Sequence, residues 1–398
     1  MVLRGKPLLA AMCIGQIGNL LPHVAVPAVM AQHLMPAWKL TATEAGLMAS
    51  SFAIGYMVAV PVLTTLTDRI DARRILITGS ATCGLATLAF GHFAHDLFSA
   101  IVWWTLAGIG FAGAYMPGLK ALTDRLAPGD KSRSVTLYTS SFSFGVGISY
   151  LVAQIAADTL GWRWAFFLTG LGPVLMIAAC LVMEPVAPLP TTGKLLDFRP
   201  VLKNRAALGY ILGYGVHCFE LYGMRTWIVA FWTFVVANNG GAAPLTALAV
   251  SVLISVMAFP ASIMGNELAL RFGRHRAITL VMIASSITAC LIGLFAGAAP
   301  WVLVVLLALY SITVPADSGA LTSGMTASAV PGQVGATMAL HSTVGFGLSA
   351  VGAWGMGVAI DAAGGPQQPS AWLAGFLLIG AAIGLGPIIL MWSRRPSA

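Results

Sequence analysis

Three side chains that could bind a proton or an anion interrupt an otherwise apolar stretch of the sequence. His217, Glu220 and Arg225 lie inside residues 206–237, a stretch long enough to cross a membrane. An ionised side chain at mid-bilayer costs roughly 2.5–3.5 kcal/mol on insertion scales, so it is rare unless it faces a polar cavity or a partner. A carboxyl group in such a low-dielectric place also binds a proton more readily than one in water. The cluster therefore predicts a functional site.

Each member of this cluster suits a different task. Glu220 and His217, one helical turn apart, are the candidate proton-coupling residues. Arg225 stays charged and presents a planar fork that matches a carboxylate or another oxyanion. A purely structural bridge from Glu220 or Arg225 to another span is the alternative.

The composition identifies the kind of protein that must position these residues. Charged residues make up 9% of the chain, whereas about 25% is usual in globular proteins, and 58% of the chain is hydrophobic. Such a chain cannot build a water-facing surface, so we expect a polytopic membrane protein. The five cysteines lie in apolar runs without CxxC spacing, which indicates free thiols and no metal site. HExxH motifs and histidine boxes are absent from the sequence, so an enzyme is not expected.

The apolar segments predict how the chain crosses the membrane. A span needs about 20 residues, and twelve segments qualify: 8–33, 44–66, 74–93, 97–123, 133–157, 163–184, 206–237, 243–269, 275–297, 299–325, 332–360 and 370–393. An even number puts both termini on one side, and most of the lysines and arginines lie in connections on that side. The positive-inside rule then makes both termini cytoplasmic in an inner (plasma) membrane. The net charge of +8 therefore reflects topology, and no nucleic-acid partner is expected.

The longest connection divides the chain into two halves. Residues 185–205 follow an N-terminal six-helix bundle, 1–184, and precede a C-terminal six-helix bundle, 206–398. Residues 116–123 resemble 314–322, which suggests a duplication. The predicted fold class is an all-α membrane protein with twelve transmembrane helices in two pseudo-symmetric six-helix bundles. Parallel six-span halves recur in transporters, whose substrate site lies between them near the midplane.

The loop between the second and third spans carries a recognisable signature. It reads Leu66-Thr67-Asp68-Arg69-Ile70-Asp71-Ala72-Arg73-Arg74, and its counterpart between the eighth and ninth spans reads Arg271-Phe272-Gly273-Arg274-His275-Arg276. With the span count and the junction at 161–166, the chain resembles the major facilitator superfamily along essentially its whole length. Asp71 stands where the signature usually has glycine, and Leu270 replaces the acid of the second copy.

The resemblance implies a function for this signature. Its charged residues are expected to form the cytoplasmic latch that holds the outward-open state; the candidate gating residues are Asp68, Arg69, Arg73, Arg74, Arg271 and Arg274. The alternative is that the arginines only anchor to phospholipid. Span 5 lacks the Gly-Pro motif of drug/proton antiporters, which favours uptake over export.

The resemblance also implies that spans 1, 4, 7 and 10 line a central cavity. The polar residues within membrane segments fall in those spans, and Gln16, Asn19 and His23 form a stripe only about 60° wide on a helix. The predicted substrate-binding residues are Gln16, Asn19, His23, Tyr115, Lys120, His217, Arg225 and Tyr310. Asp317 lies at a depth that matches Lys120, so this pair could be a gating salt bridge. Alternatively, Lys120 only snorkels to the headgroups.

These features predict a secondary active transporter that moves a small organic anion by proton symport. Proton-coupled efflux of a drug or metabolite is the alternative within transporters, and a channel or a transport-derived sensor is the alternative from another class. The expected partners are the small-molecule substrate, protons and the lipid bilayer. We expect a monomer without a cofactor.

Overall fold

The computed structural model describes residues 3–126, 131–188, 196–330 and 334–394, except for the side chains at 131–133 and 135–136. Regular structure in these residues is helical, with one isolated bridge between Leu3 and Met183. The predicted all-α class is therefore confirmed. Each predicted span corresponds to one helix or to one broken helix.

Contacts divide the chain into two compact units, unit 1 (Met1–Val29 and Ser51–Asp197) and unit 2 (Met30–Ser50 and Phe198–Ala398). The helices that begin in unit 1 are α1 (Gly5–Leu20), α2 (Ala25–Val29), α5 (Ala72–Phe93), α6 (Leu97–Thr123), α7 (Lys131–Leu160), α8 (Trp162–Gly170) and α9 (Pro173–Leu181). Those that begin in unit 2 are η1 (Met30–Leu34), α3 (Met35–Trp38), α4 (Ala42–Leu66), α10 (Arg199–Lys203), α11 (Arg205–Asn238), α12 (Ala247–Phe272), α13 (Arg274–Leu294), α14 (Pro300–Ala316), α15 (Ser318–Ser328), α16 (Val334–Ala362), α17 (Pro369–Gly384) and α18 (Gly386–Arg394).

The last unit boundary, between Asp197 and Phe198, falls inside the predicted connection 185–205, of which residues 189–195 lie outside the described part of the chain. The segment Met30–Ser50 groups with unit 2, although it precedes that connection by more than a hundred residues. Helix α4 therefore begins in unit 2 and ends in unit 1.

The number of helices that qualify as membrane spans differs from the predicted twelve. Within the described residues, ten are long and apolar enough, and the pair Gly5–Leu20 and Ala25–Trp38, bent by 48°, adds an eleventh. Helix α11, with 34 residues, is long enough but falls outside this set. Polar and charged side chains in its middle, including Glu220 and Arg225, lower its hydropathy. The helix that differs from the prediction is thus the one that carries the candidate site.

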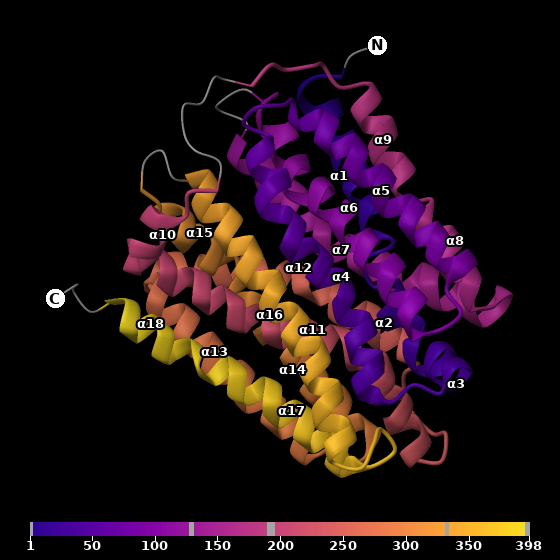
Figure 1. The fold of residues 1–398 in the computed structure, drawn as a ribbon. Coiled ribbons are helices and arrows are strands. Elements are labelled where there is room, and N and C mark those ends of the chain that lie inside the picture. Colours follow the sequence, from indigo (N-terminus) through magenta and orange to yellow (C-terminus); the bar gives the residue numbers. More distant parts are fainter. Residues whose placement is uncertain (1–2, 127–130, 189–195, 331–333, 395–398) are drawn as a thin grey trace. The chain divides into compact units, whose positions relative to one another are not determined.

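Small residues bring the helices of unit 1 together. Helices α5 and α6 lie side by side (Figure 1), and Gly79 faces Gly110 and Gly113 across this contact. A Cβ atom at Gly79 would lie 2.7 Å from the Gly110 carbonyl oxygen, which is too close for any side chain. Small residues at such positions allow the backbones of membrane helices to approach closely.

Helix α11 is the central helix of unit 2. It packs beside α16 (Figure 1) and also contacts α12, α14, α15, α17 and α18. Tyr210 and Ile211 at its start join a core cluster with Met282, Leu321 and Leu390. Because neighbours surround α11 inside this unit, its polar residues are buried.

In each unit, the first and last spans meet at one end. In unit 1, Leu3 N–H donates to the Val182 carbonyl at 2.9 Å, and Arg4 pairs with Glu184 at 2.8 Å. In unit 2, the Arg205 guanidinium donates to the Trp392 carbonyl near the end of α18. The segments 3–184 and 205–392 therefore each begin and end at the same place in their unit.

Candidate functional site

Glu220 is fully buried at the centre of unit 2. Its Oε1 atom accepts hydrogen bonds from the Ser285 hydroxyl of α13 at 2.8 Å and from the Tyr310 hydroxyl of α14 at 3.0 Å. Its Oε2 atom is buried without a hydrogen-bond partner among the described residues. No cation of the described chain forms an ion pair with this carboxyl group within 4.0 Å. Two neutral hydroxyls thus hold Glu220, and hydroxyls can donate to a carboxylate or accept from a carboxylic acid.

His217 lies one turn before Glu220 and contacts Asp317. The His217 Nδ1 and Asp317 Oδ1 atoms are 2.7 Å apart, and the two side chains are 1% and 2% exposed. Neither atom satisfies the angles of a hydrogen bond, so the pair is close without being aligned. Asp317 is the residue between α14 and α15, where the tenth predicted span is interrupted.

A second histidine extends this cluster. The Tyr214 ring stacks on His341 of α16 with centroids 3.8 Å apart, and its centroid lies 5.6 Å from that of His217. His341 is 2% exposed. His341 is a site residue that the sequence does not single out, because the one signal it gives there is a histidine inside an apolar segment.

Arg225 is also buried, with 6% of its surface exposed. Its guanidinium carbon lies 5.8 Å from the ring centroid of Tyr222 on the same helix, within the range of a cation–π interaction. A buried cation and a buried acid therefore lie on α11 five residues apart, each with its own surroundings.

The predicted polar stripe of the first span is buried in unit 1. Gln16 Oε1 accepts a hydrogen bond from the Tyr138 hydroxyl at 2.8 Å. The other amide atom of Gln16 and both amide atoms of Asn19 have no hydrogen-bond partner in the described part of the chain. Three such atoms on neighbouring turns are unusual, because buried polar groups are generally paired.

His23 lies at the break between α1 and α2. Its ring packs among Phe52, Phe111 and Phe142 with centroid distances of 5.1–5.3 Å. Tyr115 of α6 extends this aromatic group, since its ring stacks on Phe111 and meets Phe142 edge-on. Five of the predicted substrate-binding residues belong to unit 1: Gln16, Asn19, His23, Tyr115 and Lys120.

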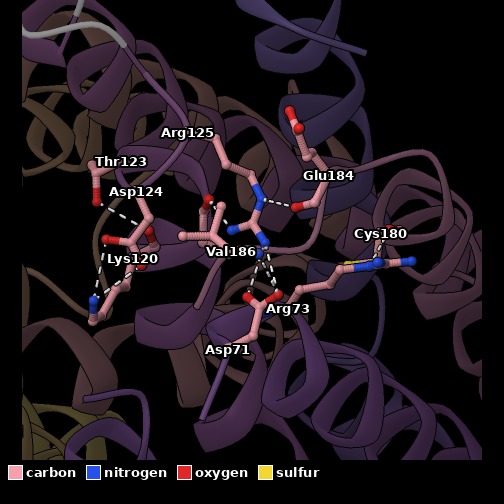
Figure 2. A network of polar contacts seen from close by, with 10 residues as sticks. Asp71, Arg73, Lys120, Thr123, Asp124, Arg125, Cys180, Glu184 and Val186 are labelled. Carbon is pink, nitrogen blue, oxygen red and sulfur yellow. Dashed lines mark hydrogen bonds and ion pairs between the residues drawn. The ribbon is translucent and has the colours of Figure 1, made fainter. Parts of the chain in front are cut away.

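A network of charges lies at one end of unit 1 (Figure 2). The Arg125 guanidinium donates to both Asp71 oxygens at 2.8 and 3.0 Å, to the Glu184 carbonyl at 2.6 Å and to the Ala121 carbonyl at 2.9 Å. Asp71 Oδ2 also accepts from the Val186 N–H at 3.0 Å. Arg125 therefore joins the end of α6, the start of α5 and the segment that follows α9.

Asp71 also caps α5 by accepting from the Arg73 N–H at 3.0 Å. Burial alone would raise the pKa of Asp71, but the hydrogen bonds from Arg125, Val186 and Arg73 outweigh it and hold that pKa below its usual value. The Arg73 side chain donates to the Cys180 carbonyl at 2.7 Å. The Asp71 carboxylate is thus stabilised in its ionised form.

The structure places the other signature residues at the surface. Arg69, Arg74 and Arg271 are exposed, Arg271 pairs with Glu267 at 2.8 Å, and Arg274 is half-buried. Asp68 forms no ion pair within the described residues. Asp71, at a position where the signature usually has glycine, forms one instead. The cytoplasmic latch stays a prediction.

Lys120 and Asp317 each have a partner in their own unit. The Lys120 ammonium pairs with Asp124, the C-cap residue of α6, at 3.0 Å (Figure 2). The Lys120 side chain is one-third exposed. Asp317 contacts His217. A gating bridge between Lys120 and Asp317 therefore also stays a prediction.

Comparison with known proteins identifies the family. The model of the Major Facilitator Superfamily matches residues 8–353, so the chain belongs to this superfamily of membrane transporters. It is a multi-pass membrane protein.

Among curated proteins, the chain is similar to spinster proteins. It is 24% identical to human protein spinster homolog 1 over 242 residues, which cover 57% of this chain and 46% of the human protein. It is 24% identical over 148 residues to an Arabidopsis thaliana protein named probable sphingolipid transporter spinster homolog 1, covering 37% of this chain and 30% of that protein. The matched segment spans less than half the length of these relatives.

Solved structures share the fold along nearly the whole chain. A bacterial homologue of the human lysosomal transporter Spinster, in an inward-facing and unoccupied conformation, aligns with a TM-score of 0.73 and 17% identity, covering 99% of this chain and 100% of that one. A mutant of the nucleoside transporter NupG aligns with a TM-score of 0.74 and 15% identity, covering 98% and 100%. The major facilitator fold predicted from the sequence is confirmed.

Proposed function

We propose that this protein is a proton-coupled secondary transporter that imports a small organic anion by alternating access. The observation that carries the proposal is the environment of Glu220, a fully buried carboxyl group held by two hydroxyls and by no cation of the described chain. Proton movement through Glu220 supplies the driving force, and Arg225 supplies the positive charge for the substrate.

The chemistry of Glu220 supports a proton site. A buried carboxylate without a paired cation is costly, and protonation removes that cost. Ser285 and Tyr310 donate to the ionised group and can remain in place when it is neutral, since a hydroxyl both donates and accepts. The Oε2 atom, without a hydrogen-bond partner among the described residues, is the atom that can carry the proton.

The second element of the proposal is the charge of Arg225. A guanidinium keeps its charge at any physiological pH and binds a carboxylate through two parallel hydrogen bonds. Arg225 lies on the same helix as the proposed proton site, five residues after Glu220. His217 lies one helical turn before Glu220 and contacts a second buried acid, Asp317. We therefore include His217 with Glu220 as a proton-coupling residue.

The orientation also belongs to the proposal. We propose that both termini lie in the cytoplasm and that the protein spans the inner membrane, because most of its lysines and arginines lie in connections on the side of the termini. The protein acts as a monomer in the bilayer. In unit 1, the amide atoms of Gln16 and Asn19, together with His23, are the polar groups that suit contact with a polar solute.

Transport into proteoliposomes tests the proposal. A panel of radiolabelled small carboxylates is offered under an inward proton gradient, and a protonophore provides the control. Accumulation that the protonophore abolishes is expected for at least one anion. Proton-driven depletion of the vesicles would instead identify an exporter and overturn the direction proposed here.

The Glu220→Gln variant tests the proton role. Glutamine keeps the shape but cannot exchange a proton, so proton-driven accumulation is expected to fall by about tenfold or more, whereas exchange of labelled for unlabelled solute persists. Glu267→Gln is the matched control, because Glu267 pairs with Arg271 at an exposed position of the same unit. Wild-type accumulation by Glu220→Gln would remove Glu220 from the coupling mechanism.

A further inference from the structure

Asp361, near the end of α16, is bound to the first turn of α4. Its Oδ1 atom accepts from the Ala42 N–H at 3.0 Å and its Oδ2 atom from the Thr43 N–H at 2.6 Å. The first N–H groups of a helix have no partner within the helix, and a negative charge there interacts favourably with the helix dipole. One carboxylate thus joins two helices that lie more than three hundred residues apart in sequence.

Helix α4 does not need Asp361 as its own cap. Thr41 and Glu44 already form a local cap: the Glu44 N–H donates to the Thr41 hydroxyl at 3.2 Å, and Glu44 Oε2 accepts from the Thr41 N–H at 2.9 Å. This reciprocal arrangement is a capping box, which satisfies the helix start with residues close in sequence. The hydrogen bonds to Asp361 therefore connect two elements rather than begin a helix.

The two helices also fit closely without side chains between them. A Cβ atom at Gly46 would lie 2.9 Å from the Ala353 carbonyl oxygen, and a Cβ atom at Gly357 would overlap the Ala42 carbonyl. Ala42 and Ala45 are fully buried. We refer to Ala42–Gly46 with Ala353, Gly357 and Asp361 as the α4–α16 contact. In this contact the two backbones pack directly against each other, and Asp361 supplies the side-chain hydrogen bonds between them.

Helix α4 belongs to both units of the chain. The helix runs unbroken from Ala42 to Leu66, yet its first turns belong to unit 2 and the part after Ser50 belongs to unit 1. Alternating access moves one half of such a transporter against the other. Both sides of the α4–α16 contact belong to unit 2, and α4 continues from this contact into unit 1. A movement of unit 1 that carries the whole of α4 with it must therefore break the contact.

We propose that Asp361 is a gating residue: its two hydrogen bonds hold the first turn of α4 on α16, and they break when the transporter opens at the end of the membrane where α4 begins. This end is opposite to the Asp71 end of α4, so it is the non-cytoplasmic side in the proposed orientation. Opening to that side breaks the α4–α16 contact, and closing restores it. The inference rests on the proposed function, since it assigns one step of alternating access to a named residue.

A thiol-labelling experiment tests this role. Ala45→Cys is introduced into a variant whose five native cysteines are replaced by alanine, and an impermeant maleimide is added from the non-cytoplasmic side. Loss of the charge in Asp361→Asn is expected to increase the labelling rate by about tenfold, the factor that corresponds to one charge-assisted hydrogen bond. Asp96→Asn is the matched control, because Asp96 caps its own helix through Ser99. Equal labelling rates with and without the Asp361→Asn substitution would overturn the proposal.

A cross-link provides a second measurement if Asp361→Asn folds poorly. Oxidation of a Thr43→Cys, Asp361→Cys double variant is expected to stop solute exchange, and reduction is expected to restore it. Full exchange by completely cross-linked protein would contradict a gating role. A failure of the proposed function gives a different result: the wild-type protein would then transport none of the solutes offered. The labelling rates would still test the role of Asp361 in that case.

Discussion

Two carboxyl groups, the largely buried Asp71 in unit 1 and the fully buried Glu220 in unit 2, have opposite surroundings. Asp71 receives two hydrogen bonds from one guanidinium and two from backbone N–H groups. Glu220 receives two hydrogen bonds from hydroxyls and none from a cation of the described residues. The donors of Asp71 satisfy a fixed negative charge, whereas the hydroxyls at Glu220 can donate to the ionised acid and can accept from the neutral acid.

The difference explains how one kind of side chain can serve two roles in a transporter. A carboxylate matched to Arg125 is costly to separate from its partner, so it stabilises one arrangement of helix ends. A carboxyl group without a matched cation is not held in its ionised form by an ion pair. The proton site proposed for Glu220 requires this property. The partners of an acid, more than its burial, therefore distinguish a structural acid from a coupling acid.

The largest expected effect comes from removing the cation of Asp71. Arg125→Ala leaves a largely buried carboxylate unpaired and is expected to destabilise the protein by about 3–5 kcal/mol. Ser285→Ala removes one hydroxyl donor from Glu220 and is expected to cost about 0.5–1.5 kcal/mol. Denaturant unfolding in detergent measures both. Equal losses would break the contrast between the two acids.

Arg4→Ala is the control for the charge itself. Arg4 pairs with Glu184 at 2.8 Å, but the side chains are 75% and 46% exposed. Exposed pairs contribute about 0–1 kcal/mol, so this variant should unfold nearly as the wild type does. If Arg4→Ala lowered the unfolding free energy as much as Arg125→Ala does, the effect would come from positive charge at this end of unit 1 and not from the pair of Arg125 with Asp71.

The pH dependence of stability is the next effect in size. The pKa of Asp71 in the folded protein lies below its usual value, so the native state favours the ionised form. Its contribution to stability is therefore complete above the unfolded pKa of about 3.9 and is lost as pH falls toward the folded pKa. The difference in unfolding free energy between wild type and Asp71→Asn should shrink as pH falls from about 5 to about 3. A difference independent of pH would contradict an ionised Asp71.

The same pair of acids marks what the sequence could reveal. Glu220 stands out because an acid in an apolar segment is costly wherever it lies, so composition alone identifies it. Asp71 lies in a loop, where acids are common, and its partner Arg125 is 54 residues away. Such a pairing depends on how α5 and α6 pack, which residue spacing does not encode.

The fold was predictable for a related reason. Apolar segments of membrane length and the asymmetry of basic loops are local features of a sequence, and they located the helices. The breaks at His23 and Asp317 were not predicted, because they depend on contacts such as that of Ser149, which donates to the Leu21 carbonyl across the first break. The stacking of His341 on Tyr214 joins α11 and α16 and has no local signal either.

The smallest expected effect concerns Lys120. Its pair with Asp124 is an i,i+4 pair that is about one-third exposed, and such pairs contribute about 0.3–0.5 kcal/mol. Lys120→Ala should therefore leave the unfolding free energy almost unchanged, in contrast to Arg125→Ala, five residues later at the same end of unit 1.

This small effect on stability makes Lys120→Ala a suitable test of function, because a change in transport cannot then be attributed to unfolding. A raised KM for the transported anion with unchanged maximal rate would identify Lys120 as a substrate contact, whereas a lowered rate with unchanged KM would identify it as a gating residue. If both constants keep their wild-type values, Lys120 only pairs with Asp124, and the positive charge for the substrate comes from Arg225.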